Sequence, residues 1–167
     1  SGHIPDLLEH YPVKWHLHPD DTFLQTLATS SAQRYGLEVP KPATADVDLV
    51  PDEILGVGAL EFEILHTPGH TLGGCCLRLI VTDGPDHLFV GDTLFAGSVG
   101  RTDLPDTGGD FTVLARSIHT QLWPLAPDTI VYPGHGPLTT IGHEKKTNPF
   151  VGDDAGASGI YSRGKYA

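Results

Sequence analysis

The sequence is poor in several residue types, and each shortage excludes a class of protein. Its 167 residues include only two cysteines, Cys75 and Cys76. Adjacent residues of a strand point to opposite faces, so these two are not expected to pair, and a chain without a disulfide framework favours a reducing cytoplasm. Basic residues are also scarce, since 10 Lys and Arg stand against 21 Asp and Glu, giving a formal net charge of −11. This balance argues against nucleic acid or an anionic membrane as the main partner.

Long apolar runs are missing as well. No stretch approaches the roughly 20 residues of a membrane-spanning helix, and Ser1 to Tyr11 lacks the layout of a signal peptide. Glycine and proline are plentiful by contrast, with 20 and 14 residues placed between short apolar segments, as in a loop-rich enzyme. A chain of this length and composition is expected to form one globular, cytoplasmic domain.

Hydrophobic patterning indicates an α/β protein. Leu60, Phe62 and Ile64 alternate with two glutamates, as in a half-buried strand. An amphipathic helix is expected to begin after Asp110 and to end near Pro124. The full set of expected elements is a helix at 4–10, a strand at 13–17, a helix from 20 or 21 to 36, a surface connection at 37–51, strands at 60–64, 75–81, 87–90 and 130–132, and the amphipathic helix within 111–122.

Three of these strands run into a residue that can bind a metal. His70, Asp92 and His135 each follow an apolar segment, and each has a glycine as its neighbour, which lets backbone approach closely. Strand ends of one sheet lie side by side, so side chains at equivalent ends can converge. A lone histidine among the ten of this chain is usually structural, but two Pro-Gly-His tripeptides and one Gly-Asp in this setting favour a metal site. Two imidazoles and a carboxylate suit zinc, iron or manganese.

The segments around these residues resemble three successive signatures of the metallo-β-lactamase superfamily. They read Thr67-Pro68-Gly69-His70-Thr71, Phe89-Val90-Gly91-Asp92-Thr93-Leu94-Phe95 and Tyr132-Pro133-Gly134-His135-Gly136-Pro137. The flanking stretches at 97–103, 138–144 and 148–150 are similar to those of small glyoxalase II enzymes, the short hydroxyacylglutathione hydrolases. The similarity covers about residues 1–151.

The resemblance implies an αββα sandwich with two divalent metals between its sheets, zinc in the first place and iron or manganese as alternatives. Carried over, His70 is a ligand of the first metal, Asp92 bridges both metals, and His135 is a ligand of the second. The family reaction is hydrolysis of a thioester by a hydroxide that bridges the metals, which also stabilise the oxyanion. No side chain of this chain is singled out as catalytic, and none as a site for an organic cofactor.

The family's first signature, His-x-His-x-Asp-His, is missing. The nearest string begins at His16 and has the early spacing but not the closing histidine, so we assign His16 and His18 to a strand and its exit. The chain is expected to hold the C-terminal two-thirds of the domain, at 1–151, and a loosely held tail at 152–167. Three ligands cannot fill two coordination shells, so activity is predicted for the parent protein and left open for this chain, as a fragment or as a half-site protein. A missing sheet is also expected to leave a face of the strand from Leu60 to Leu65 uncovered.

Other polar residues near the signatures have competing interpretations. Arg101 either orients a substrate carboxylate or pairs with Asp103 or Asp106. Lys145 and Lys146 are interpreted as exposed helix lysines rather than as partners of a glutathione carboxylate.

Three further residues are given structural roles. Glu144 is interpreted as an acid on a helix surface. His66 and His143 are interpreted as loop or supporting residues beside the ligands. The two cysteines lack the His-Asn partner pattern of a nucleophile, so catalysis by cysteine is not expected.

The leading function is therefore metal-dependent hydrolysis of a small-molecule thioester, with a glutathione conjugate as the expected substrate. One alternative is a mononuclear-iron enzyme like the persulfide dioxygenases, but the segment around His135 favours the hydrolase. The other alternative is a non-catalytic half-site remnant, suggested by the missing signature, which would hold less than one metal tightly per chain.

Overall fold

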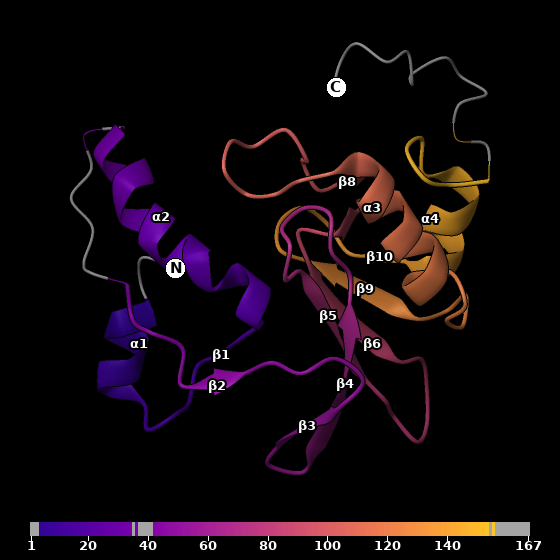
Figure 1. Ribbon diagram of the computed structural model, residues 1–167. Helices are drawn as coiled ribbons and strands as arrows, with labels where there is room; N and C mark the ends of the chain where they lie inside the picture. The colour runs from indigo at the N-terminus through magenta and orange to yellow at the C-terminus, as the bar shows by residue number, and fades with distance from the viewer. Residues whose placement is uncertain (1–3, 35, 37–41, 154, 156–167) are drawn as a thin grey trace. The chain divides into compact units, whose positions relative to one another are not determined.

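The computed structural model describes residues 4–34, 36, 42–153 and 155. The chain divides into two compact units, Ser1–Val50 and Pro51–Ala167, and each is considered by itself (Figure 1). Within the described residues, no helix is both long enough and apolar enough to cross a membrane. Most of the expected tail at 152–167 lies outside the described residues.

The first unit holds the two expected helices and one short strand pair. Its elements are α1 (Ile4–His10), β1 (His16–Leu17), a 3₁₀ turn (Pro19–Asp21), α2 (Thr22–Arg34) and β2 (Val47–Asp48). The helix at 4–10 is confirmed, whereas the strand expected at 13–17 is reduced to β1, which pairs in parallel with β2. The connection expected at 37–51 thus contains a strand, and its first part, 37–41, lies outside the described residues.

A six-stranded sheet forms the second unit, in the order β10-β9-β6-β5-β4-β3. The strands are β3 (Ile54–Val57), β4 (Leu60–His66), β5 (Cys75–Leu79), β6 (His87–Gly91), β9 (Ile130–Pro133) and β10 (Thr139–Thr140), and a separate hairpin is made of β7 (Leu94–Phe95) and β8 (Ser98–Val99). Neighbouring strands are antiparallel except β6 and β9, which run parallel with Leu88 opposite Val131. The parallel pair places the ends of β6 and β9 at the same edge of the sheet.

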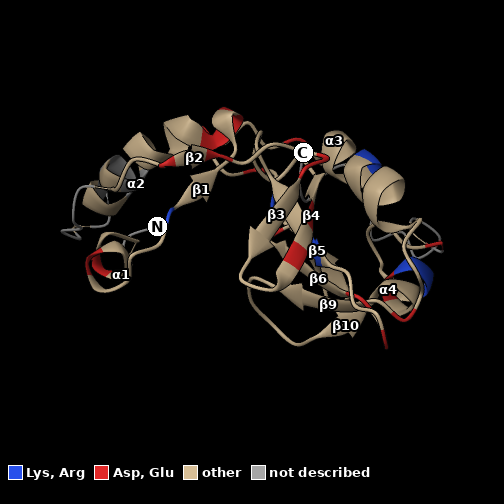
Figure 2. Ribbon diagram, turned by 90° about the horizontal axis from the view of Figure 1, so that it is seen from below, with Lys and Arg blue, Asp and Glu red and all other residues tan. Residues whose placement is uncertain are grey.

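Two helices cover one face of this sheet (Figures 1 and 2). α3 (Phe111–Ser117) continues into a π-helical turn (Ile118–Leu122), and α4 (Ile141–Thr147) follows β10. Asp110 caps α3 as expected, because its carboxylate accepts a hydrogen bond of 3.0 Å from the backbone N–H of Val113. The core between helices and sheet consists of Leu65, Cys76, Leu88, Val90, Leu94, Val99, Leu114, Ile118, Leu122, Trp123, Val131, Ile141 and Val151.

The opposite face of the sheet carries a row of aromatic rings. Phe89 alternates with the buried Leu88 and Val90, stacks on Tyr132 at 4.9 Å between ring centres, and is 40% exposed. The uncovered face expected on β4 is found only in part, since Leu60 is 48% exposed while Ile64 is buried. The exposed apolar side chains of the sheet thus include Ile54 and Val57 on β3, Leu60 at the start of β4 and Phe89 on β6.

Candidate metal centre

His70 lies on the loop that follows β4. Gly69 before it has a φ of +129°, and a Cβ there would overlap the backbone of Leu114, so this loop packs directly on α3. Nδ1 of His70 lies 2.6 Å from the carbonyl oxygen of Arg101. A carbonyl can only accept, so Nδ1 carries the proton and donates it. In the neutral ring of this tautomer Nε2 has a lone pair, which a metal ligand requires.

Asp92 follows β6 directly. Gly91 has a φ of +50°, and Thr93 donates a backbone hydrogen bond of 3.0 Å to the carbonyl of Val90, so the chain turns sharply at the aspartate. Its two carboxylate oxygens face two different histidines. Oδ2 lies 3.8 Å from Nε2 of His70, and Oδ1 lies 3.8 Å from Nε2 of His135. The structure thus brings the three residues together at one point.

His135 lies on the loop after β9, and its side chain is 71% exposed. The loop is fixed to the end of β6 because the N–H of Gly134 donates to the carbonyl of Gly91 at 2.7 Å. A Cβ at Gly134 would overlap Oδ1 of Asp92, so a larger residue there would push this carboxylate oxygen out of its position. The imidazole stacks on the ring of Phe95, with 4.3 Å between centres and 26° between planes.

A further glycine, Gly100, lies against both His70 and Asp92. A Cβ there would overlap the carbonyl oxygen of Asp92 and would lie 3.2 Å from Cβ of His70. Gly100 is buried and begins the segment whose Arg101 carbonyl orients His70. The end of β8 is therefore packed between the two loops that carry His70 and Asp92.

Buried polar side chains lie behind the same two loops. The hydroxyl of Thr67 is 3.3 Å from that of Thr93 and 3.2 Å from Sγ of Cys76. Burial raises the pKa of the Cys76 thiol to about 11, against a smaller lowering by its hydrogen bonds to the two threonines. Cys76 is therefore a neutral thiol near neutral pH.

The three residues open into a cavity of about 390 Å³. Its other lining residues are Phe95, Ala96, Ser98, Val99, Gly100, Arg101, Leu104, Gly136 and Pro137. Of the two interpretations of Arg101, the ion pair with Asp103 is confirmed, with nitrogen–oxygen distances of 2.9 and 3.2 Å. Arg101 therefore lines the cavity as one half of an ion pair.

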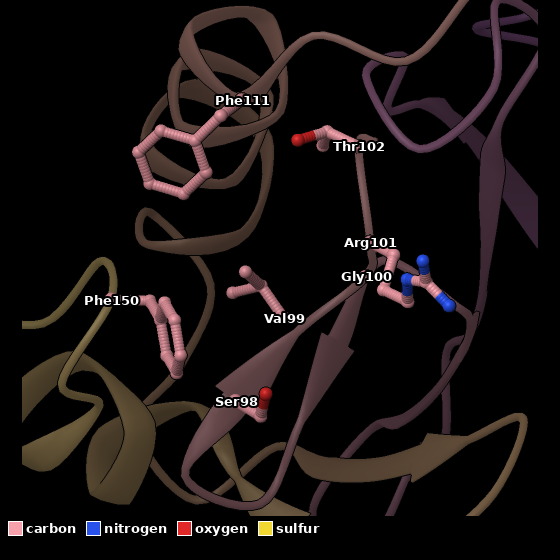
Figure 3. Close-up of a pocket in the computed structure, with 7 residues that line it drawn as sticks. All are labelled: Ser98, Val99, Gly100, Arg101, Thr102, Phe111 and Phe150. Carbon is pink, nitrogen blue, oxygen red and sulfur yellow. The ribbon is translucent and has the colours of Figure 1, made fainter. Parts of the chain in front are cut away.

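A smaller pocket of about 80 Å³ is also lined by the 98–101 segment, together with Thr102, Phe111 and Phe150. In Figure 3, Val99 points toward the rings of Phe111 and Phe150, whereas the guanidinium of Arg101 points away from them. The 98–101 segment thus lines both this pocket and the cavity that contains His70, Asp92 and His135.

The remaining predicted residues have structural positions. His16 lies in β1, and His18 accepts a hydrogen bond of 3.2 Å from the backbone N–H of Asp20 at the start of the 3₁₀ turn. Lys145 and Lys146 are exposed on α4 as expected, and Nζ of Lys145 donates to the carbonyl of Trp123 at 3.2 Å.

The interpretation of Glu144 as a surface acid is wrong. Its side chain is fully buried and hydrogen-bonded to Thr139, Gly97 and Asn148. The reason is tertiary, because the turn between β7 and β8 lies over α4 and offers its backbone N–H to the carboxylate. The flanking His143 and Lys145 are exposed and give no sequence signal of this burial.

Comparison with known proteins identifies related chains. A family model described as the metallo-beta-lactamase superfamily matches residues 1–135. The hydroxyacylglutathione hydrolase GloC of Haemophilus influenzae is 40% identical over 159 residues, covering 90% of this chain and 69% of its own length. Among solved structures, the B3 metallo-beta-lactamase BLEG-1 has a TM-score of 0.79 and 37% identity, covering 90% of this chain and 70% of that one. TTHA1623 in a di-iron-bound form has a TM-score of 0.74 and 38% identity, covering 89% and 70%.

Proposed function

Because this chain belongs to the metallo-beta-lactamase superfamily, whose members are metal-dependent hydrolases, we propose that the protein hydrolyses a thioester of a small molecule, such as an S-2-hydroxyacylglutathione. The observation that carries the proposal is that two imidazoles face the two oxygens of a single carboxylate, each at 3.8 Å. The name of the GloC relative supports the thioester and the glutathione conjugate. A cytoplasmic location is part of the proposal, because neither Cys75 nor Cys76 is in a disulfide.

The donor set fits divalent metals. Zinc binds imidazole nitrogen and carboxylate oxygen at about 2.0–2.2 Å, so a separation of 3.8 Å between two donor atoms suits a shared ion. His70 has the tautomer needed for ligation, since its Nδ1 donates to the Arg101 carbonyl. We assign His70 to one metal, His135 to a second and Asp92 to both. Zinc is our first choice, and the di-iron form of TTHA1623 supports iron as an alternative.

Bound metals of this kind activate water near neutral pH and stabilise the charge that develops on a carbonyl oxygen. The residues of this chain supply position. Asp92 holds its oxygens toward both imidazoles, and the Arg101 carbonyl fixes the ring of His70. The apolar wall of the cavity, which includes Phe95 and Leu104, would exclude water around the acyl group.

Metal analysis with a hydrolysis assay tests this function. The full-length protein, loaded with zinc, iron or manganese, is expected to hold two metals and to cleave S-lactoylglutathione. Asp92→Asn should lower the number of metals bound per chain, because a neutral amide cannot bridge two cations. It should also lower kcat/KM at least 100-fold. Asp128→Asn, which removes an exposed carboxylate, is the matched control and should change neither.

Three results would contradict the proposal. Two bound metals with neither S-lactoylglutathione nor simple lactones cleaved would remove the hydrolase assignment. Oxygen uptake with glutathione persulfide under iron loading would favour the persulfide dioxygenase alternative. Less than one tightly held metal and no turnover in the full-length protein would favour the non-catalytic remnant.

A further inference from the structure

Glu144 is a buried carboxylate outside the candidate metal centre, and its hydrogen bonds lead toward that centre. Oε2 accepts from the backbone N–H of Gly97 at 2.9 Å and from Nδ2 of Asn148 at 2.8 Å. Oε1 accepts from the hydroxyl of Thr139 at 2.6 Å. Burial of a carboxylate is costly unless such donors surround it, so the position of Glu144 depends on these three hydrogen bonds.

Two of the three partners of Glu144 belong to segments beside the cavity, the β7–β8 hairpin and the strand after the His135 loop. Gly97 is in the turn of the β7–β8 hairpin and has a φ of +70°, and Thr139 begins β10, just after the loop that carries His135. Asn148 adds a second hold on the hairpin, because its Nδ2 also donates to the carbonyl of Ser98 at 3.0 Å. The carboxylate of Glu144 on α4 and the side-chain amide of Asn148 just after α4 thus fix the turn of the hairpin.

The hairpin in turn carries the ring that orients His135. Phe95 is the last residue of β7 and stacks on the imidazole at 4.3 Å. His70 is fixed by a hydrogen bond to a backbone carbonyl, but among the described residues nothing is hydrogen-bonded to Nδ1 of His135. Its ring is 71% exposed, so the contact with Phe95 is what restrains it beside Asp92.

We propose that Glu144 is a positioning residue for His135, acting through the β7–β8 hairpin and the ring of Phe95. This inference rests on the proposed metal role of His135. When the hairpin turn is held against α4, Phe95 keeps Nε2 of His135 directed at Oδ1 of Asp92. Without Glu144, the turn keeps only the hydrogen bond from Asn148 to Ser98, so the ring of Phe95 shifts and the imidazole samples other orientations.

The test compares two substitutions of Glu144 in the full-length chain. Glu144→Leu removes all three hydrogen bonds. Glu144→Gln can keep them, because its amide oxygen accepts from Gly97 and Asn148 while its NH₂ donates to the hydroxyl of Thr139. Ile141→Ala is the matched control, since it loosens the same helix at a buried apolar site and leaves the hydrogen bonds of Glu144 in place.

Three measurements are made on each variant: the dissociation constant for Co²⁺, hydrogen exchange at the Gly97 amide, and the ring resonances of His135 without metal. Glu144→Leu is expected to raise the Co²⁺ dissociation constant about 10-fold, to speed Gly97 exchange and to shift the His135 resonances. Glu144→Gln should stay within about threefold of wild type for Co²⁺. Ile141→Ala should lower the Tm and leave the local readouts unchanged.

Phe95→Leu tests the route. It removes the ring contact and leaves the hydrogen bonds of the hairpin, so it should weaken Co²⁺ binding about 10-fold with Gly97 exchange unchanged. In the double variant Glu144→Leu/Phe95→Leu the two losses should not add, because both act on the same contact.

The positioning role is overturned if Glu144→Leu leaves the His135 resonances unchanged, or if Ile141→Ala shifts them as much. It is also overturned if Glu144→Gln weakens Co²⁺ binding as much as Glu144→Leu does, or if the losses of Co²⁺ affinity add in the double variant. A wild-type protein that binds no Co²⁺ would instead contradict the proposed function. In that case the exchange and ring measurements without metal decide the positioning role. They are made on Glu144→Leu if this variant folds. If it does not fold, Thr139→Val, which removes a single hydrogen bond, takes its place.

Discussion

At the scale of single residues, the candidate metal centre depends on three glycines, which have no side chain to keep neighbouring loops apart. Gly69, Gly100 and Gly134 each occupy a place where a Cβ would overlap a neighbouring backbone or ligand atom. Close approach of three loops is what brings the two imidazoles to one carboxylate. The glycines beside His70 and His135 belong to the Pro-Gly-His tripeptides, where close backbone approach was predicted, whereas Gly100 lies outside them, directly after β8.

Replacement of Gly100 by alanine tests this close packing. The added methyl group would overlap the carbonyl oxygen of Asp92, so we expect Gly100→Ala to lower the free energy of unfolding by about 2 kcal/mol. Gly56→Ala is the control, since its Cβ meets nothing within 4 Å and alanine suits a strand slightly better than glycine. Urea unfolding measures both. Equal stability of the two variants would contradict the packing described.

At the scale of elements, the strands were predictable where their pattern is long. β4, β5, β6 and β9 follow from alternation or from continuous apolar runs, and the Asp110 cap follows from its residue type. β7, β8 and β10 have two residues each, which is too short for any period to show. These short strands are fixed by tertiary hydrogen bonds instead.

The candidate site divides in the same way. The positions of His70, Asp92 and His135 follow from strand ends and neighbouring glycines. The stacking of Phe95 and the burial of Glu144 depend on how the β7–β8 hairpin folds back over α4, and no local pattern carries that information.

An ion-pair cluster joins neighbouring strands of the sheet and makes their stability depend on pH. Arg78 on β5 donates to Asp86 at 2.6 and 2.8 Å and to Glu63 on β4 at 3.0 Å. Burial alone would raise the pKa of Asp86, but hydrogen bonds from Arg78 and from the N–H of Val81, with the charge of Arg78, outweigh it and hold the pKa below its usual value.

A depressed pKa in the folded state means that this stabilisation is present above the unfolded-state pKa, about 3.9, and is lost as the pH falls through the lower folded-state value. We expect Arg78→Met to cost about 2 kcal/mol at pH 7, with a smaller difference from wild type as the pH falls from 5 toward 3. Arg116→Met, on the exposed side of α3, should cost less than about 0.5 kcal/mol at every pH. Urea titrations at a series of pH values measure both, and a gap for Arg78→Met that does not change with pH would contradict the assignment.

At the scale of the whole molecule, the adjacent cysteines report on opening of the core. Cys76 is fully buried and its pKa is raised to about 11, so it is a neutral thiol near neutral pH, whereas Cys75 lies on the opposite face of β5 and is half-buried. A disulfide reagent should modify Cys75 first in the native protein and reach Cys76 only when the core opens. Cys75→Ser should therefore show no labelling in native buffer and one thiol in denaturant. Rapid native labelling of that variant would show that β5 opens without global unfolding.

The parallel pairing of β6 with β9 has a consequence for the order of folding. A nascent chain can form the meander from β3 to β6 by local hairpins, but β9 can join it only after the 92–129 segment has crossed over and packed α3 on the sheet. Asp92 and His135 therefore meet late, and the imidazole–carboxylate cluster cannot serve as the nucleus around which this half of the molecule collapses. In a refolding experiment, convergence of these donors should track the slowest phase and lag behind formation of the early hairpins.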